Sequence, residues 1–208
     1  MLIQNNQFRQ LRRFLENYHE AGGAGFIRIN PERGRFHPPL ANVDARDNAG
    51  FSSVMLAVVE NQHDIAEAMI NAGADVLVQN HSTLESALIL AAQRGYTDLV
   101  ELLLKNVITK EDRDAKDKKG MTALAWASLN GHLDTVKLLC SKKAGPNVAD
   151  SAGMTPFLHA CAAGHREIVN VLLVSGANIQ IKNKNNQSAL QLATGDVSSL
   201  LREKGASD

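Results

Sequence analysis

Aromatic residues are scarce in this chain of 208 residues: they make up 4% of it and include a single tryptophan. Its two cysteines, Cys140 and Cys161, provide no disulfide framework, and we expect both to be buried as small hydrophobes. No segment approaches the roughly 18 consecutive apolar residues of a membrane span, and the N-terminus lacks the apolar centre of a signal peptide. These absences predict a protein of the cytoplasm or nucleus that does not enter a membrane.

Common motifs of catalysis are also missing. The sequence has neither the phosphate-binding pattern G-x-x-x-x-G-K-[ST] nor the nucleophile turn G-x-S-x-G. His159 and Cys161 lie two residues apart on an expected helix, where side chains diverge, so they make a poor metal site. His132 and His165 each follow a glycine where a helix is expected to begin, which favours a capping role. We therefore predict no enzymatic activity, no cofactor and no metal site, and we place Trp126 in the core.

Charge is balanced, with 22 basic and 22 acidic residues, so global electrostatics favour neither nucleic acid nor a membrane surface as a partner. The distribution is less even. Residues 1–40 carry 6 basic and 3 acidic side chains, residues 41–109 carry 3 and 9, and residues 110–208 carry 13 and 10. This polarity either steers a partner or is ordinary solvation of the surface.

The sequence contains an internal repeat. It reads G-M-T-A-L-A-W-A-S-L-N-G-H from Gly120 and G-M-T-P-F-L-H-A-C-A-A-G-H from Gly153. Taking the first glycine as a marker, the units begin at positions 50, 84, 120, 153 and 186, which are 34, 36, 33 and 33 residues apart by subtraction. In each unit a Ser or Thr starts a short helix, small residues follow, and a second segment carries apolar residues at helical spacing. Such units bury their apolar faces against their neighbours.

A period near 33 with T-P-L-H-like, G-H and L-L-L segments resembles the ankyrin repeat. The resemblance covers residues 41–206, with units starting near 47, 81, 117, 150 and 183 and a truncated last unit that serves as a C-terminal cap. It implies an all-α solenoid of stacked helix-turn-helix units with extended finger loops. The histidine of the T-P-L-H segment, which bridges neighbouring repeats in the family, is replaced in every unit. We therefore expect packing, rather than hydrogen bonds, to hold the repeats together.

Residues 1–40 do not fit the repeat. Residues 1–20 have helical spacing of apolar side chains and are expected to form an N-terminal capping helix. A loop rich in glycine, proline and arginine follows at residues 21–40, where the glycines and prolines exclude a helix. Such a loop either contacts a partner or packs passively on the first repeat.

The family resemblance implies that a partner protein or peptide segment binds on a concave surface made of finger tips and the exposed edges of the first helices. Among the candidates, Phe51, Met121, Met154 and Leu129 are expected to form an apolar strip. The full set of candidate partner-binding residues is Asn48, Phe51, Glu60, Thr83, Glu85, Arg94, Lys118, Lys119, Met121, Leu129, Asn130 and Met154. The function predicted is that of an intracellular adaptor or regulatory subunit, monomeric on its own. Alternatives are an inhibitor that occludes an enzyme and the targeting domain of a longer protein.

Overall fold

The computed structural model describes residues 46–207; the expected capping helix at residues 1–20 and the loop at residues 21–40 lie outside the described residues. Over residues 46–207 the chain is helical, and extended backbone pairs only through isolated bridges, Arg46 with Ser52, Gln79 with Ser86 and Lys182 with Ser188. The prediction of an all-α fold is thus confirmed. The chain divides into two compact units, Met1–Ala87 and Leu88–Asp208, here called unit 1 and unit 2.

Unit 1 contains one described helix pair, α2 (Ser53–Val59) and α3 (His63–Asn71), which pack against each other. Two finger turns flank this pair, at residues 46–52 and 79–86, and each is closed by one of the isolated bridges. The His81 amide of the second turn donates to the Ala49 carbonyl of the first over 3.0 Å. The two fingers of unit 1 are therefore joined through their backbones.

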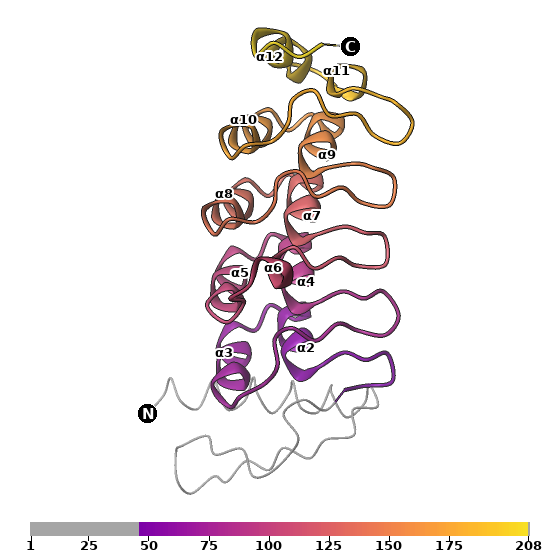
Figure 1. Ribbon diagram of the computed structural model, residues 1–208. Helices are drawn as coiled ribbons and strands as arrows, with labels where there is room; N and C mark the ends of the chain where they lie inside the picture. The colour runs from indigo at the N-terminus through magenta and orange to yellow at the C-terminus, as the bar shows by residue number, and fades with distance from the viewer. Residues whose placement is uncertain (1–45, 208) are drawn as a thin grey trace, which may run out of the picture. The chain divides into compact units, whose positions relative to one another are not determined.

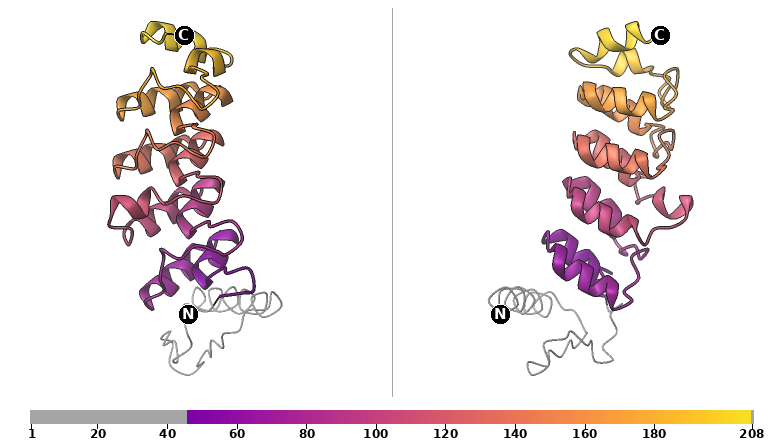
Figure 2. Two further views of the ribbon diagram at one scale, coloured as in Figure 1. Left: turned by 45° about the vertical axis from the view of Figure 1, so that its right-hand side comes forward. Right: turned by 90° about the vertical axis from the view of Figure 1, so that its left-hand side faces the viewer.

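Unit 2 repeats this pattern of two helices and a finger (Figure 1). Its first helix, α4, begins one residue before the unit, at Ala87. The helices are α4 (Ala87–Arg94), α5 (Thr97–Leu104), α6 (Lys110–Arg113), α7 (Ala123–Leu129), α8 (Leu133–Ser141), α9 (Pro156–Ala163), α10 (Arg166–Val174), α11 (Ala189–Leu192) and α12 (Val197–Glu203). In this unit the first helices α4, α7, α9 and α11 form one row and the second helices α5, α8, α10 and α12 form another (Figure 2). The fingers project on the side of the first helices.

Side-chain hydroxyls start the first helices, as the repeated Ser or Thr predicts. Thr122 accepts from the Ala125 amide and Thr155 from the Leu158 amide, and each stands in the extended conformation just before its helix. Pro156 follows Thr155 at the first helical position, where no amide hydrogen is missed. Ser188 and Gln191 form a reciprocal capping box on the four-residue helix α11. The helices α7, α9 and α11 therefore begin where their sequence indicates.

The core of unit 2 lies between the two rows of helices. Ala91, Ala92, Ala127 and Ala160 are fully buried, so neighbouring first helices approach closely without side chains to separate them. Leucines and valines of the second helices, Leu103, Val136 and Leu172 among them, are also fully buried. Apolar burial of this kind is the dominant favourable term in folding.

Hydrogen bonds also join successive repeats, so the expectation that packing alone would hold them together is wrong. His132 Nε2 lies 3.0 Å from the Gln93 carbonyl oxygen, and His165 Nε2 lies 3.1 Å from that of Leu129. These histidines stand just before α8 and α10, yet their side chains make no capping bond to their own helices. They bond to the preceding repeat because its first helix ends in carbonyls that have no partner in that helix. The G-H histidines thus bridge the repeats.

Candidate partner-binding surface

The finger turns of unit 2 are built around an aspartate or asparagine three residues before the marker position. Asp117 Oδ1 accepts from the Lys119 and Met121 amides over 2.8 and 2.9 Å, and Asp150 Oδ1 accepts from the Ala152 and Met154 amides over the same distances. Short polar side chains stabilise turns in this way because they satisfy amides that the turn leaves without a backbone partner. The conformation of each finger is therefore set within the finger itself.

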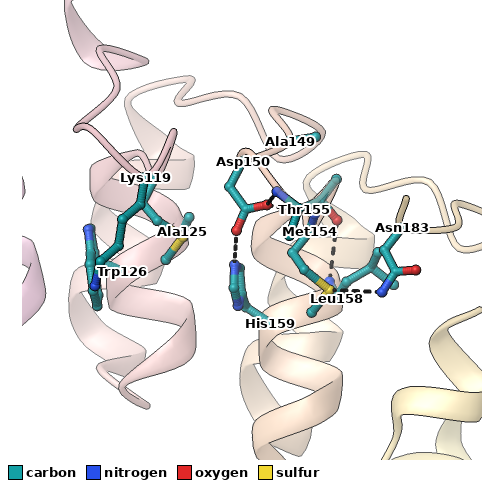
Figure 3. Close-up of polar contacts among 12 residues, drawn as sticks. Lys119, Ala125, Trp126, Ala149, Asp150, Met154, Thr155, Leu158, His159 and Asn183 are labelled. Carbon is teal, nitrogen blue, oxygen red and sulfur yellow. Dashed lines mark hydrogen bonds and ion pairs between the residues drawn. The ribbon is translucent and has the colours of Figure 1, made fainter. Parts of the chain in front are cut away.

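The second carboxylate oxygen of each turn aspartate reaches the first helix that follows. Asp117 Oδ2 accepts from the Trp126 indole nitrogen over 2.8 Å, and Asp150 Oδ2 lies 2.9 Å from His159 Nε2. Trp126 and His159 occupy equivalent positions on α7 and α9 and are both part-exposed (Figure 3). The same carboxylate thus orients a finger and a ring on the adjoining helix.

Trp126 is therefore not a core residue, which corrects the prediction from sequence. Its ring carries the Lys119 ammonium at 5.1 Å from the ring centroid, within the range of a cation–π interaction (Figure 3). At an exposed site such a contact contributes roughly 0.5–1 kcal/mol. The finger tip and α7 together present an indole ring flanked by a positive charge.

Five of the candidate residues of unit 2 lie on its fingers or at the ends of its first helices and have accessible side chains. Arg94, Lys118, Lys119 and Asn130 are exposed, while Leu129 is half-buried. Two of them are also anchored. The Arg94 guanidinium donates to the Leu90 carbonyl over 3.2 Å, and the Asn130 amide group donates to the Gln93 carbonyl over 2.8 Å.

The expected apolar strip does not form as predicted. Met121 is only 3% exposed, because it follows the finger turn into the core, so it is unavailable to a partner in this fold. Met154, at the equivalent place in the next finger, is half-buried, and its sulfur lies 3.5 Å from the Asn183 side-chain nitrogen. In unit 2 the accessible apolar surface of the candidate set is limited to Leu129 and Met154, and Trp126 extends it.

Unit 1 holds the other five candidates. Asn48, Glu60 and Thr83 are exposed, and Phe51 and Glu85 are half-buried. The Thr83 hydroxyl lies 2.8 Å from Asn80 Oδ1 and 2.6 Å from Glu85 Oε2, so these polar groups are engaged within their own finger. The structure brings Thr83 and Glu85 together on one turn.

Sequence reasoning missed three residues of the surface in unit 2: Asp117, Asp150 and, as a surface residue, Trp126. A signal was present, because an aspartate or asparagine precedes the marker by three residues in four of the units, at positions 47, 117, 150 and 183. The side of α7 on which Trp126 lies was less readable. Its hydrogen-bond partner on the finger was also hidden, since Asp117 is nine positions away in the sequence.

The described residues contain no cluster of three His, Cys, Asp or Glu side chains suited to a metal ion, and no helix of residues 46–207 is long and apolar enough to cross a membrane. Cys161 is fully buried as expected, and burial raises its pKa to about 12, so its thiol stays protonated at neutral pH. Cys140 is only half-buried and lines a cavity of about 730 Å³ with Lys137 and Val174. Burial raises its pKa as well. Neither thiol is an activated nucleophile.

Paired short helices, projecting fingers and bridges from one repeat to the next define a helical repeat protein. Comparison with known families agrees: the model for ankyrin repeats, in three copies, matches residues 54–150 and 142–207. The chain therefore belongs to the ankyrin repeat family, and its repeats form a protein-interaction module.

Several known proteins are similar to this chain. The ankyrin repeat and KH domain-containing protein mask-1 of Caenorhabditis elegans is 33% identical over 136 residues, which are 65% of this chain and 5% of that protein. The putative ankyrin repeat protein YahD of Escherichia coli K12 is 30% identical over 158 residues, 73% of this chain and 77% of YahD. The B-cell lymphoma 3 protein homolog of the mouse is 27% identical over 155 residues, 74% of this chain and 34% of the homolog. The chain thus spans about a twentieth of the nematode relative and about three quarters of the bacterial one.

Proposed function

We propose that this protein is a non-enzymatic adaptor or regulatory subunit that binds a partner protein or peptide segment on the finger side of unit 2. The surface concerned, called the finger face below, consists of Arg94, Lys118, Lys119, Trp126, Leu129, Asn130 and Met154. The protein acts as a monomer in the cytoplasm or nucleus and needs neither a cofactor nor nucleic acid.

One observation carries this proposal: the finger face combines accessible side chains with a backbone that is already held in place. The Ser151 amide donates to the Lys119 carbonyl and the Lys184 amide to the Ala152 carbonyl, each over 3.0 Å, so adjacent fingers are bonded to one another. The aspartates fix each turn from within. A surface ordered before binding loses little conformational entropy when a partner arrives, which favours its use in recognition.

A pair of matched double variants tests the proposal. The finger-face variant carries Lys118→Ser and Trp126→Ala. The control variant carries Lys142→Ser and Val174→Ala on the second-helix side, where Lys142 is exposed and Val174 is 91% exposed. Circular dichroism and thermal unfolding first establish that both variants keep their helix content.

Partners are captured from a cell extract with the wild type, identified by mass spectrometry, purified and titrated against all three proteins. We expect the purified partner to lose at least about tenfold in affinity, about 1.4 kcal/mol, for the finger-face variant alone. Equal affinity for the wild type and the finger-face variant, with loss in the control, would place binding on the second helices and contradict the proposal.

A further inference from the structure

The fingers of unit 2 expose lysines while their aspartates are turned inward, and this arrangement points to the chemistry of the partner. We infer that the finger face binds an acidic peptide segment that places one apolar side chain against Trp126. The inference rests on the proposed function and adds to it the sign of the partner's charge and the position of its anchor.

The finger tips of unit 2 expose positive charge. Lys118 and Lys119 lie at the tip of one finger, and Lys182 and Lys184 lie on another; all four side chains are exposed. Arg94 adds a fifth cation at the end of α4. Cations gathered along one face raise the local potential and attract an anionic partner.

The acidic residues of these fingers do not offset that charge at the surface, because both are turned inward. Asp117 is 7% exposed and accepts three hydrogen bonds, two from backbone amides and one from the Trp126 indole. The Asp150 side chain is 9% exposed; it accepts two backbone amide bonds and pairs with His159. Each carboxylate is therefore occupied within its own repeat.

Exposed acidic side chains of unit 2 lie instead on the second helices and on the segments next to them. They are Asp98, Glu101, Glu111, Asp134, Glu167, Asp196 and Glu203. Exposed cations accompany them there, Lys105, Lys137 and Lys142 among them, so the second-helix side of unit 2 carries both signs of charge while its fingers expose lysines. An anionic partner is therefore attracted to the finger side rather than to the second helices.

An apolar anchor position lies beside the lysines. Trp126 and Leu129 are three residues apart on α7, so their side chains are neighbours on that helix, and both are part-exposed. The Lys119 ammonium lies over one face of the indole ring at 5.1 Å from its centroid, so the remaining exposed part of the ring and Leu129 form the anchor position. An aliphatic or aromatic side chain packed here would bury apolar area while carboxylates beside it meet the lysines.

The surface favours a peptide over a nucleic acid. Single-stranded nucleic acids are bound through successive aromatic platforms on which their bases stack. Trp126 is the one tryptophan of the chain, and its equivalent on α9 is His159, whose ring is already paired with Asp150. Leu129 and Met154 offer aliphatic contacts instead. The experiment below therefore includes a single-stranded nucleic acid as the competing ligand.

The test selects short random peptides on the intact chain from a displayed library and compares the composition of the enriched peptides with that of the library. Selected peptides are then titrated by fluorescence, since the single tryptophan reports directly on this site. We expect enrichment of Asp and Glu around one apolar residue, a change in Trp126 emission on binding, and affinity that falls as ionic strength rises. Between about 0.01 M and about 1 M salt the Debye length shrinks from roughly 30 Å to roughly 3 Å, which screens such contacts.

Charge reversal locates the contact. Lys118→Glu with Lys184→Glu should weaken binding of the acidic peptides by at least about tenfold. The control, Lys105→Glu with Lys142→Glu, changes the net charge equally at exposed sites that end the second helices α5 and α8, and it should leave affinity within about twofold.

The outcomes separate the inference from the proposed function. Enriched peptides that are not acidic but still lose affinity for the Lys118, Lys184 variant, or for Trp126→Phe, would overturn the inference and leave the proposed function standing. Peptides that are insensitive to both finger variants, or a library with no enrichment, would overturn both. An oligothymidylate that quenches Trp126 more tightly than the peptides at equal salt would replace the acidic peptide with a nucleic acid.

Discussion

At the scale of single residues, the glycine and the histidine of the G-H segment act together across neighbouring repeats. Gly131 lies in the turn that follows α7 and has a φ of +80°, a conformation that glycine adopts without strain. The space where its Cβ would stand is taken by His165 of the next repeat, whose ring carbon Cε1 lies 2.8 Å away. Gly95 meets His132 in the same manner, with Nδ1 at 2.5 Å. The glycine therefore has two roles: it allows the positive φ of the turn, and it leaves room for the ring of the bridging histidine.

Two glycine substitutions separate these roles. Gly176→Ala should cost about 1–2 kcal/mol of unfolding free energy, because its φ of +92° strains any side chain but nothing lies within 4 Å of the added Cβ. Gly131→Ala should cost at least about 1 kcal/mol more, since the His165 ring must shift and give up its bond to Leu129. Denaturant unfolding measures both values.

Adding His165→Ala provides the control for this prediction. Removal of the ring should narrow the difference between the two glycine variants, because the added Cβ then meets open space. Equal costs for Gly131→Ala and Gly176→Ala in the wild-type background would show that the histidine does not restrict position 131.

At the scale of elements, the first helices α7 and α9 share a capping threonine, but only α9 has a proline at its first position. The helices α7 and α9 both begin after a threonine whose side chain caps the third residue of the helix. The first helical residue is Pro156 in α9 and Ala123 in α7. Thr122 has a ψ of 168°, the extended conformation that a following proline requires. The start of α7 is therefore already compatible with proline.

Ala123→Pro should accordingly be tolerated and raise the unfolding free energy by up to about 1 kcal/mol, since proline restricts the unfolded chain where the native conformation already fits. Ala127→Pro, in the interior of the same helix, should cost at least about 3 kcal/mol. Thermal unfolding followed by circular dichroism compares the two. A lower melting temperature for Ala123→Pro would show that the neighbouring repeats do not accommodate the ring at α7 as they do at α9.

At the scale of the whole molecule, the fingers are ordered by the same repetition that orders the helices. In unit 1 the His81 amide bonds to the Ala49 carbonyl, and in unit 2 the Ser151 and Lys184 amides bond to the carbonyls of Lys119 and Ala152. Each finger also carries an aspartate or asparagine that holds its own turn. Exposed side chains therefore stand on loops that are paired like short pieces of a sheet.

Hydrogen exchange measured by NMR tests this order. The amides of His81, Ser151 and Lys184 should exchange about twofold to about tenfold more slowly than in an unstructured peptide, although they lie in loops, because each is bonded to the adjacent finger with a net stabilisation of roughly 0.5–1.5 kcal/mol. Exchange of these three amides at unstructured rates would mean that the fingers move independently, and it would remove the support for a surface ordered before binding.

Much of this architecture was predictable because its causes are local and recur. The capping hydroxyls, the left-handed glycines and the apolar stripes each act within a few residues, and their repetition at a period near 33 identifies the unit and the family. Four of the candidate residues of unit 2, Arg94, Lys118, Lys119 and Asn130, are exposed, and their contact with a partner stays a prediction.

Where contacts cross from one segment to another, only the tertiary structure decided the outcome. Met121 and Met154 hold the same register, yet Met121 is buried and Met154 is half-buried, a difference that the register does not predict. The Trp126 indole is held against the finger because Asp117 accepts its hydrogen bond, and His132 and His165 bridge repeats because the preceding helix offers free carbonyls. The sequence by itself determined the repeat, its helices and their caps. Packing between elements distant in sequence determined which side chains remain available to a partner.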